Sequence, residues 1–315
     1  MEIIIGSRGS KLALWQSEWV KARLEALDAG VSVRIEIVKT SGDIMRDVPL
    51  SIIGGQGAFT KELEVALLER RINVAVHSLK DLPTIVPAGL SITATPERED
   101  PRDALVLRAD TDTRGASIKG LAEGAIVGTS SLRRIAQLKH LRPDLRIKDL
   151  RGNVDTRLRK LDEGEYDALI LASAGLRRLG FGARIGAAIN AAEMLPAVGQ
   201  GALGIETRAD DIETNALVMQ LDDMRTRAAV LAERALLRSL GGGCQVPIAA
   251  HAIVEGDRMR LDGLVASLDG AHVIRDTLEG SSSDAAGLGD ALAARLLERG
   301  AGTLLAELPV QMNDE

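Results

Sequence analysis

Short apolar runs alternate with helical patterns through the first two hundred residues of this 315-residue chain. The runs at residues 2–6 (EIIIG), 33–38 (VRIEIV) and 74–79 (VAVHSL) have the length and composition of buried strands. Residues 11–27 and 59–71, which lie between them, carry apolar residues at helical spacing. This strand–helix–strand order predicts a mainly parallel sheet with helices packed against it.

A second series of the same kind follows. It contains predicted strands at residues 103–108, 125–131, 145–150 and 166–175 and predicted helices at residues 132–141 and 153–164. The charged, proline-bearing segment 96–104 (PEREDPRDA) separates the two series and predicts a crossing between domains.

The pattern changes in the last third of the chain. Residues 199–208 (GQGALGIETR) predict one more strand, and two predicted helices then run to about Leu240, so we expect the chain to return to its first domain. Three period-two segments, 248–256, 258–267 and 271–280, follow with tight turns between them, and a helix at 283–299 closes the chain. These segments predict a small antiparallel sheet with helices on one face.

The predicted fold class is therefore α/β with three domains: two α/β lobes with mainly parallel sheets and a small α+β C-terminal domain with an antiparallel sheet. We place the first lobe at 1–97 and 200–219, the second at 98–199 and the third domain at 220–315.

The amino-acid composition argues against several classes of partner. A hydrophobic content of 45% with 27% charged residues predicts a globular protein with a sizeable core. Aromatic residues make up only 2% of the chain and the net charge is −6, which argues against a nucleic-acid partner that stacks its bases on the protein. The chain begins directly with a predicted strand and holds no apolar run of membrane-spanning length, so we expect a cytoplasmic protein without a membrane partner.

Positive charge is concentrated in one region. Residues 131–184 contain thirteen Lys plus Arg and seven Asp plus Glu, a local charge of +6 in an acidic chain. Such asymmetry indicates either a field focused on an anionic small molecule or a set of solvated helix faces.

The polar residues of interest follow predicted strands, where helix N-termini offer unpaired N–H groups to anions. These residues are Ser7, Arg8, Ser10, Lys80, Asp81, Thr129, Ser130, Ser131, Arg133, Arg134, Arg151, Asn153, Arg157, Arg177 and Arg178. The planar guanidinium fork binds carboxylates or phosphates through paired hydrogen bonds. Several such forks at successive strand ends predict a ligand with several anionic groups.

Four other features leave alternatives open. Cys244, the single cysteine, follows three glycines and is a nucleophile, an attachment point, a metal ligand or a small apolar filler. Asp81 is the one acid among the basic positions and either stabilises a developing cation or caps a turn. The glycine-rich segment 54–57 lacks the ending of a phosphate loop and predicts a mobile loop, and His77 predicts a packed or hydrogen-bonded side chain.

Eight segments together resemble the porphobilinogen deaminase (hydroxymethylbilane synthase) family. They are SRGSKLALWQ (7–16), GAFTKELEVALL (57–68), AVHSLKDLP (75–83), EREDPRDA (97–104), VGTSSLRR (127–134), LRGNVDTRLRKLDEGEYDALILA (150–172), LPAVGQGALGIE (195–206) and GGGCQVPI (241–248). The resemblance extends in order through all but about the last sixty residues.

The resemblance implies an enzyme of tetrapyrrole biosynthesis that condenses four porphobilinogen molecules head to tail into hydroxymethylbilane and releases ammonia at each addition. It implies a dipyrromethane cofactor held through a thioether to Cys244, and no metal. It also implies lobes that resemble type II periplasmic binding proteins, a monomer, and a product that passes to uroporphyrinogen-III synthase.

The resemblance assigns roles residue by residue. Asp81 matches the catalytic position that hydrogen-bonds pyrrole N–H groups and stabilises the cation formed as ammonia leaves. The implied cofactor-binding residues are Cys244, Lys80, Asp81, Ser10, Thr129, Ser131, Arg133, Arg134, Arg151 and Arg157. The implied substrate-binding residues are Arg8, Ser10, Arg151, Arg157, Arg178, Gln16, Gln200 and Phe59.

One loop departs from the family pattern, because relatives often carry lysines near the positions of Ile52 and Gln56. Two other functions remain as alternatives. A two-lobed anion-binding protein explains the arginines but not Cys244 or Asp81, and a thiol hydrolase requires a base, for which His251 is near in sequence.

Overall fold

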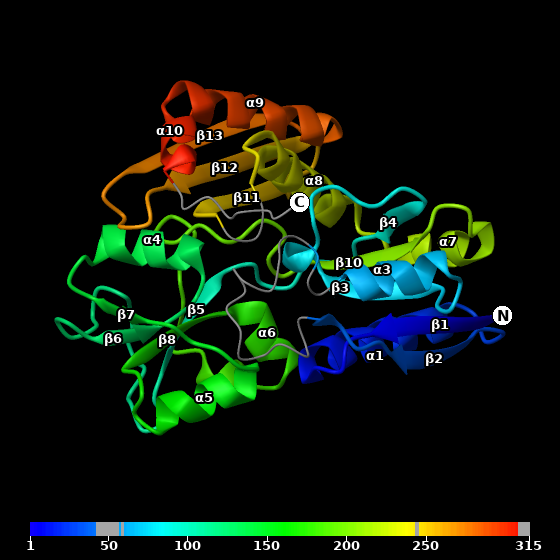
Figure 1. Cartoon of the computed structure of the whole chain (residues 1–315), viewed down its shortest axis with the longest axis horizontal. Coiled ribbons are helices and arrows are strands. Elements are labelled where there is room, and N and C mark those ends of the chain that lie inside the picture. The colour runs from blue at the N-terminus through cyan, green and yellow to red at the C-terminus, as the bar shows by residue number, and fades with distance from the viewer. Residues whose placement is uncertain (42–56, 58–59, 243–245, 308–315) are drawn as a thin grey trace. The chain divides into compact units, whose positions relative to one another are not determined.

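The computed structural model describes residues 1–41, 57, 60–242 and 246–307 and contains two compact units (Figure 1). The first unit consists of residues 1–98 and 202–228. The second consists of residues 99–201 and, within the described range, 229–307.

The first unit is built on one sheet. Its strands are β1 (Glu2–Ser7), β2 (Ser32–Ile37), β3 (Val74–Ser78), β4 (Leu90–Ala94) and β10 (Leu203–Arg208). They are ordered β2-β1-β3-β10-β4. Strand β1 runs parallel to β2 and β3, whereas β10 runs antiparallel to both β3 and β4. Four of the five strands therefore share one direction, and the predicted mainly parallel sheet is confirmed.

Helices cover both faces of this sheet. They are α1 (Lys11–Leu27), α3 (Lys61–Leu68), η1 (Leu79–Asp81), α7 (Ile212–Val218) and η3 (Met219–Leu221). Helix α1 begins where predicted because the Ser10 hydroxyl accepts the Ala13 N–H at 3.3 Å and caps the first turn. Val20 of α1 packs with Val76 on one face, and Leu63 of α3 packs with Ala75 on the other. The helices thus lie on opposite faces of β3.

The second unit repeats this arrangement. Its first sheet contains β5 (Asp103–Leu107), β6 (Ile126–Gly128), β7 (Arg146–Lys148), β8 (Ala168–Ala172) and β9 (Ala187–Ala188) in the order β7-β6-β8-β5-β9. Strand β5 is antiparallel to both β8 and β9, as β10 is to its neighbours in the first unit. The helices are α4 (Leu132–Leu141), α5 (Val154–Asp162), α6 (Ser173–Arg178) and η2 (Gly182–Arg184).

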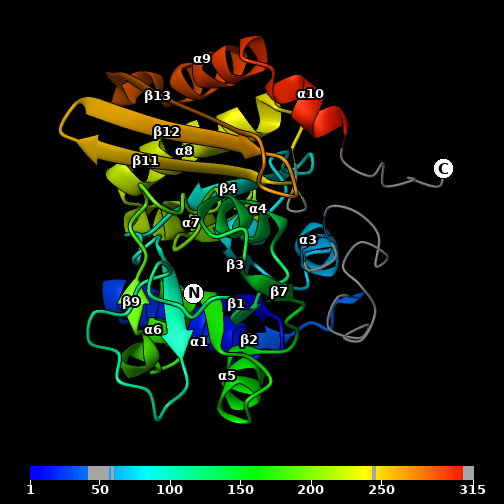
Figure 2. The ribbon, with the colours of Figure 1, turned by 90° about the vertical axis from the view of Figure 1, so that its left-hand side faces the viewer.

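The C-terminal part of the second unit carries the predicted antiparallel sheet. It consists of β11 (Ile248–Glu255), β12 (Arg258–Ala266) and β13 (Val273–Ser281), which lie side by side in Figure 2. The helical segments of this part are α8 (Met224–Ser239), η4 (Ser282–Asp284), α9 (Ala285–Glu298) and α10 (Ala301–Ala306). A Cβ on Gly263 of β12 would lie 2.8 Å from Leu236 of α8 and 3.1 Å from Leu292 of α9. Both helices therefore pack on one face of the sheet, which confirms the prediction.

A buried carboxylate joins three segments of the second unit. Glu233 of α8 is fully buried and accepts the Gly199 N–H at 2.7 Å and the Ala252 N–H at 2.9 Å. Because its two oxygens bind backbone groups on different segments, Glu233 fixes α8 to the 199 loop and to β11.

Candidate active site

A pocket of about 70 Å³ in the first unit brings together several of the predicted site residues. It is lined by Arg8, Ser10, Leu12, Ala13, Gln16, Thr60, Val76, His77, Ser78 and Asp81. Strands β1 and β3 are parallel neighbours that end at Ser7 and Ser78, so their carboxyl ends open at the same edge of the sheet. This topology explains why residues seventy positions apart in sequence line one pocket.

Local hydrogen bonds hold the pocket walls. The buried Gln16 side chain donates from Nε2 to Ser78 Oγ at 2.9 Å, which ties α1 to the end of β3. The Leu79 N–H donates to the Ala202 carbonyl, and the Leu82 N–H donates to the Leu79 carbonyl, so the short η1 turn is anchored at both ends. Asp81 closes this turn and is partly exposed to the pocket. Lys80 belongs to the same turn but is not among the lining residues.

In the second unit, the predicted residues follow β6, β7 and β8. Thr129 follows β6, and its hydroxyl accepts the Ser131 N–H at 3.3 Å. Arg151 follows β7 and donates to Asp149 at 2.8 Å, while Arg157 of α5 donates to the Gly152 carbonyl at 2.7 Å. Gly152 has φ of +105°, a conformation that favours glycine and lets the chain turn into α5.

Arg178 lies at the end of α6 and is largely withdrawn from solvent. Its guanidinium donates to the Gly201 carbonyl at 2.7 Å. Burial lowers the pKa of Arg178 to about 10, so this side chain still carries its positive charge at neutral pH. A buried cation of this kind is suited to an anionic group of a ligand.

Asp103 is a buried acid that the sequence reasoning missed. It is fully buried at the start of β5 and binds Arg133 at 2.7 Å, Arg134 at 2.7 Å and Gln200 at 2.9 Å. Burial alone would raise the pKa of Asp103, but the two guanidinium groups outweigh it and hold that pKa well below its usual range. Burial also lowers the pKa of Arg133. We call Asp103, Arg133, Arg134 and Gln200 the Asp103 cluster.

The Asp103 cluster includes two of the arginines that were predicted to bind the cofactor. The Arg133 and Arg134 side chains are 4% and 9% exposed, and both guanidinium groups bind the Asp103 carboxylate. Gln200, predicted to lie beside the site, belongs to the same cluster. The direct binding of cofactor carboxylates by these arginines stays a prediction, and the structure shows them within a buried ion-pair network.

Four residues of the sequence analysis lie outside the described residues: Ile52, Gln56, Phe59 and Cys244. Residues 54–56 of the predicted glycine-rich loop lie outside them too. His251 lies on β11 and pairs with Asp262 of β12. A hydrogen bond of 3.0 Å joins His77 Nε2 and Glu206, which confirms the predicted hydrogen-bonded side chain.

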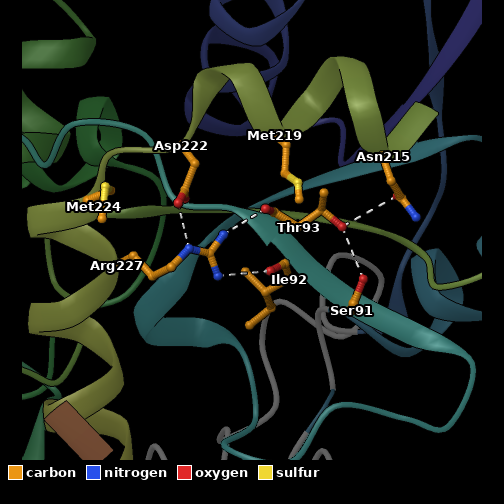
Figure 3. A pocket seen from close by; sticks show the side chains of 8 residues that line it. All are labelled: Ser91, Ile92, Thr93, Asn215, Met219, Asp222, Met224 and Arg227. Carbon is orange, nitrogen blue, oxygen red and sulfur yellow. Dashed lines mark hydrogen bonds and ion pairs between the residues drawn. The ribbon is translucent and has the colours of Figure 1, made fainter. Parts of the chain in front are cut away.

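A second pocket, of about 550 Å³, lies elsewhere in the first unit and is lined by none of the predicted residues (Figure 3). Its polar side chains bind one another: Arg227 donates to Asp222 and to the Thr93 carbonyl, both at 2.6 Å. Thr93 also lies 2.6 Å from the hydroxyl of Thr207. We assign no function to this pocket.

Two further searches covered the described part of the chain. Across residues 1–41, 57, 60–242 and 246–307, no group of three or more His, Cys, Asp or Glu side chains is placed to hold a metal ion. No helix in the same ranges has the length and apolar character needed to cross a membrane.

Comparison with known proteins identifies the family. Residues 3–216 match the dipyrromethane cofactor binding domain of porphobilinogen deaminase, and residues 226–298 match the C-terminal domain of that family. The porphobilinogen deaminase of Syntrophobacter fumaroxidans is 51% identical over 306 residues, which cover 97% of each chain. That of Roseiflexus sp. is 51% identical over 304 residues, which cover 96% of this chain and 98% of the relative.

Solved structures with a similar backbone include the VFT2 domain of Bordetella pertussis BvgS and an ancestral amino-acid-binding protein. The first has a TM-score of 0.40 and 15% identity, covering 70% of this chain and 85% of that domain. The second has a TM-score of 0.37 and 15% identity, and the match covers 70% of this chain and 87% of the ancestral protein.

The sequence matches confirm the predicted family, enzyme class and role in tetrapyrrole biosynthesis, together with the predicted dipyrromethane cofactor. The relatives are matched over nearly their whole length, so both family domains are present. This chain belongs to the porphobilinogen deaminase family.

Proposed function

We propose that this chain condenses four porphobilinogen molecules head to tail into hydroxymethylbilane, with release of one ammonia at each addition, and that Asp81 is its catalytic residue. The observation that carries the proposal is the pocket in which the Asp81 carboxylate lies with Arg8, Ser10 and Gln16 at the carboxyl ends of β1 and β3. An acid beside a cation and neutral hydrogen-bonding groups suits a substrate that has both carboxylates and a ring that becomes cationic.

The proposed role of Asp81 is electrostatic. Its carboxylate accepts hydrogen bonds from a pyrrole N–H and stabilises the positive charge that develops on the substrate as ammonia leaves. The η1 turn supports this role because its two backbone hydrogen bonds hold Asp81 in place before the substrate arrives.

The proposed carboxylate-binding residues divide between the two units. Arg8 and Ser10 contribute from the first unit, with Lys80 beside Asp81. In the second unit we assign this role to Thr129, Ser131, Arg151, Arg157 and Arg178. Every porphobilinogen carries an acetate and a propionate, so the local excess of cations at residues 131–184 matches the charge of the ligand.

The donor set of the second unit also fits the acidic dipyrromethane cofactor. The Nε of Arg133 is buried and has no hydrogen-bond partner among the described residues, although the rest of its guanidinium binds Asp103. We propose that the Asp103 cluster positions Arg133 and Arg134 toward cofactor carboxylates. The cofactor, attached to Cys244, supplies a covalently held primer for the condensation.

Several finer features belong to the same proposal. We infer a cytoplasmic monomer that passes its product to uroporphyrinogen-III synthase. We also propose three domains, namely a lobe at 1–97 and 200–219, a lobe at 98–199 and a C-terminal domain at 220–315, because strands β5–β9 and strands β11–β13 form two separate sheets.

The intact mass of the purified protein tests the cofactor attachment. We expect the wild-type mass to exceed the sequence mass by two linked pyrrole units, and the Cys244→Ser variant to have the mass of its sequence alone. The serine variant is the matched control because it changes one atom and keeps the polar side chain. Equal excess mass in both proteins would exclude attachment at Cys244.

A further inference from the structure

Three titratable side chains lie on α3 or on the face of the sheet that α3 covers, and one of them, His77, lines the Asp81 pocket. They are Glu64 of α3, His77 of β3 and Glu206 of β10. His77 and Glu206 are 5% and 0% exposed, and a hydrogen bond of 3.0 Å joins His77 Nε2 and Glu206 Oε2. In the antiparallel β3–β10 pair, His77 lies opposite Gly204, and Glu206 lies opposite Ala75, whose side chain packs under α3. Both ionisable side chains therefore point to the face that α3 covers.

The charges of this group do not balance. Glu206 is the carboxyl group that binds the His77 imidazole, and the Oε1 atoms of Glu64 and Glu206 are both buried without a hydrogen-bond partner among the described residues. Burial raises the pKa of Glu64, and the nearby Glu206 carboxylate raises it further. Glu64 is half-buried, and its buried Oε1 lacks a hydrogen-bond partner among the described residues, so the protonated form of this carboxyl group is favoured relative to an exposed glutamate.

Other charged side chains lie on the surrounding elements. Glu62, on the same helix, accepts the Ser41 N–H at 2.8 Å. Arg208, further along β10, binds Asp211 and the carbonyls of Leu67 and Ile72. Arg8 and Asp81 face the group from the pocket side. The other Glu62 oxygen, Oε2, is buried without a hydrogen-bond partner among the described residues, and Glu62 also raises the pKa of Glu64, so Glu62 contributes to the proton balance of the group.

The group is connected directly to the pocket. His77 lines the pocket that Asp81 lines, and so does Thr60, whose carbonyl accepts the Glu64 N–H at 2.9 Å. A change of charge on Glu64 consequently alters the electrostatic potential at His77, which lines the pocket.

We propose that Glu64, His77 and Glu206 form a proton-holding cluster that positions charge beneath the Asp81 pocket, with Glu64 as the residue that gains and loses the proton. The catalytic part of this inference rests on the proposed function of Asp81. When Glu64 ionises, the cluster gains one negative charge, which favours the cation that develops on the substrate. Glu64 does not contact the substrate. It acts as a positioning residue because its charge changes the electrostatic potential at the pocket.

The pH dependence of turnover tests the catalytic part. We expect wild-type kcat to rise across the range in which Glu64 ionises, and Glu64→Gln to lose this rise, so that its kcat is about three- to tenfold lower at the alkaline end. KM should change little, and Glu64→Asp should restore the rise because it restores a titrating carboxyl group. Glu18→Gln, on the exposed side of α1, is the matched control and should keep the wild-type profile. A Glu64→Gln profile that superimposes on the wild type overturns the proposal.

Infrared spectroscopy tests the proton itself without reference to catalysis. In a pH titration, the carbonyl stretch of a protonated carboxylic acid in the holoenzyme should persist to higher pH than that of an exposed glutamate, and Glu64→Gln should lose this component while Glu18→Gln keeps it. A wild-type titration without this component, or a component unchanged in Glu64→Gln, overturns the cluster. An Asp81→Asn variant with full turnover would instead defeat the proposed function while leaving the infrared result intact, so the two failures are distinguishable.

Discussion

Replacing Asp103 by asparagine should lower the free energy of unfolding by about 3–5 kcal/mol. Asparagine has nearly the same shape, so packing is preserved, but Arg133 and Arg134 lose the carboxylate that both bind. Two buried guanidinium groups without a counter-charge are far more costly than a missing hydrogen bond. Chemical denaturation of wild type and variant under the same conditions measures the difference.

An exposed ion pair provides the control for this variant. Asp112 binds Arg114 at 2.7 Å, but their side chains are 60% and 91% exposed. Asp112→Asn should leave stability almost unchanged because water screens the pair and replaces it. If Asp103→Asn lowered the free energy of unfolding as little as Asp112→Asn, the ion pairs of the Asp103 cluster would not contribute to stability as proposed.

The effect of Asp103 also depends on pH in a defined direction. Because its folded-state pKa is lowered, its contribution to stability is present above the unfolded pKa and is lost as pH falls through the folded pKa. The stability difference between wild type and Asp103→Asn should therefore be largest near neutral pH and shrink in strong acid.

The second large effect is the loss of turnover that we expect when Asp81 is replaced. Asp81→Asn should lower turnover of porphobilinogen about 10²- to 10³-fold while the variant melts at the wild-type temperature. The amide keeps the shape and can still accept a hydrogen bond, but it lacks the charge that stabilises a cation. Steady-state rates and thermal melting of the same preparations separate loss of chemistry from loss of fold.

An exposed acid in the same unit controls for the change of charge. Asp210, whose side chain is 63% exposed, pairs with Arg70 on the surface, and Asp210→Asn should keep full activity. A loss for Asp81→Asn of only a few-fold would reduce Asp81 to a substrate-orienting residue and remove it as the catalytic group.

Local signals in the sequence predicted much of the fold. The first helix was expected at residues 11–27 and is found there, because Ser10 caps its first turn and apolar residues recur at helical spacing. The short helix α10 at Ala301–Ala306 was not predicted, since six residues carry too little periodicity to separate it from the preceding helix.

The candidate site was predictable only in part. Strand ends located Arg8, Ser10 and Asp81, because the carboxyl ends of adjacent parallel strands converge, whereas Gln16 was named only through the family resemblance. Asp103 and Gln200 could not be joined to Arg133 in this way, since about a hundred residues separate the first two and only packing brings them together. Glu64 is equally hidden in sequence, where it looks like a polar position on a surface helix. Its buried oxygen is a consequence of β10 lying beneath α3.

The most direct test of the central claim is to mix the purified protein with porphobilinogen, quench the reaction at short times, and measure the intact protein mass together with the ammonia released. The account predicts a ladder of stepwise mass gains, one ammonia for each porphobilinogen consumed, and no ladder in the Cys244→Ser variant. Consumption of porphobilinogen without any covalent mass gain, or an unmodified protein that releases no ammonia, would contradict it.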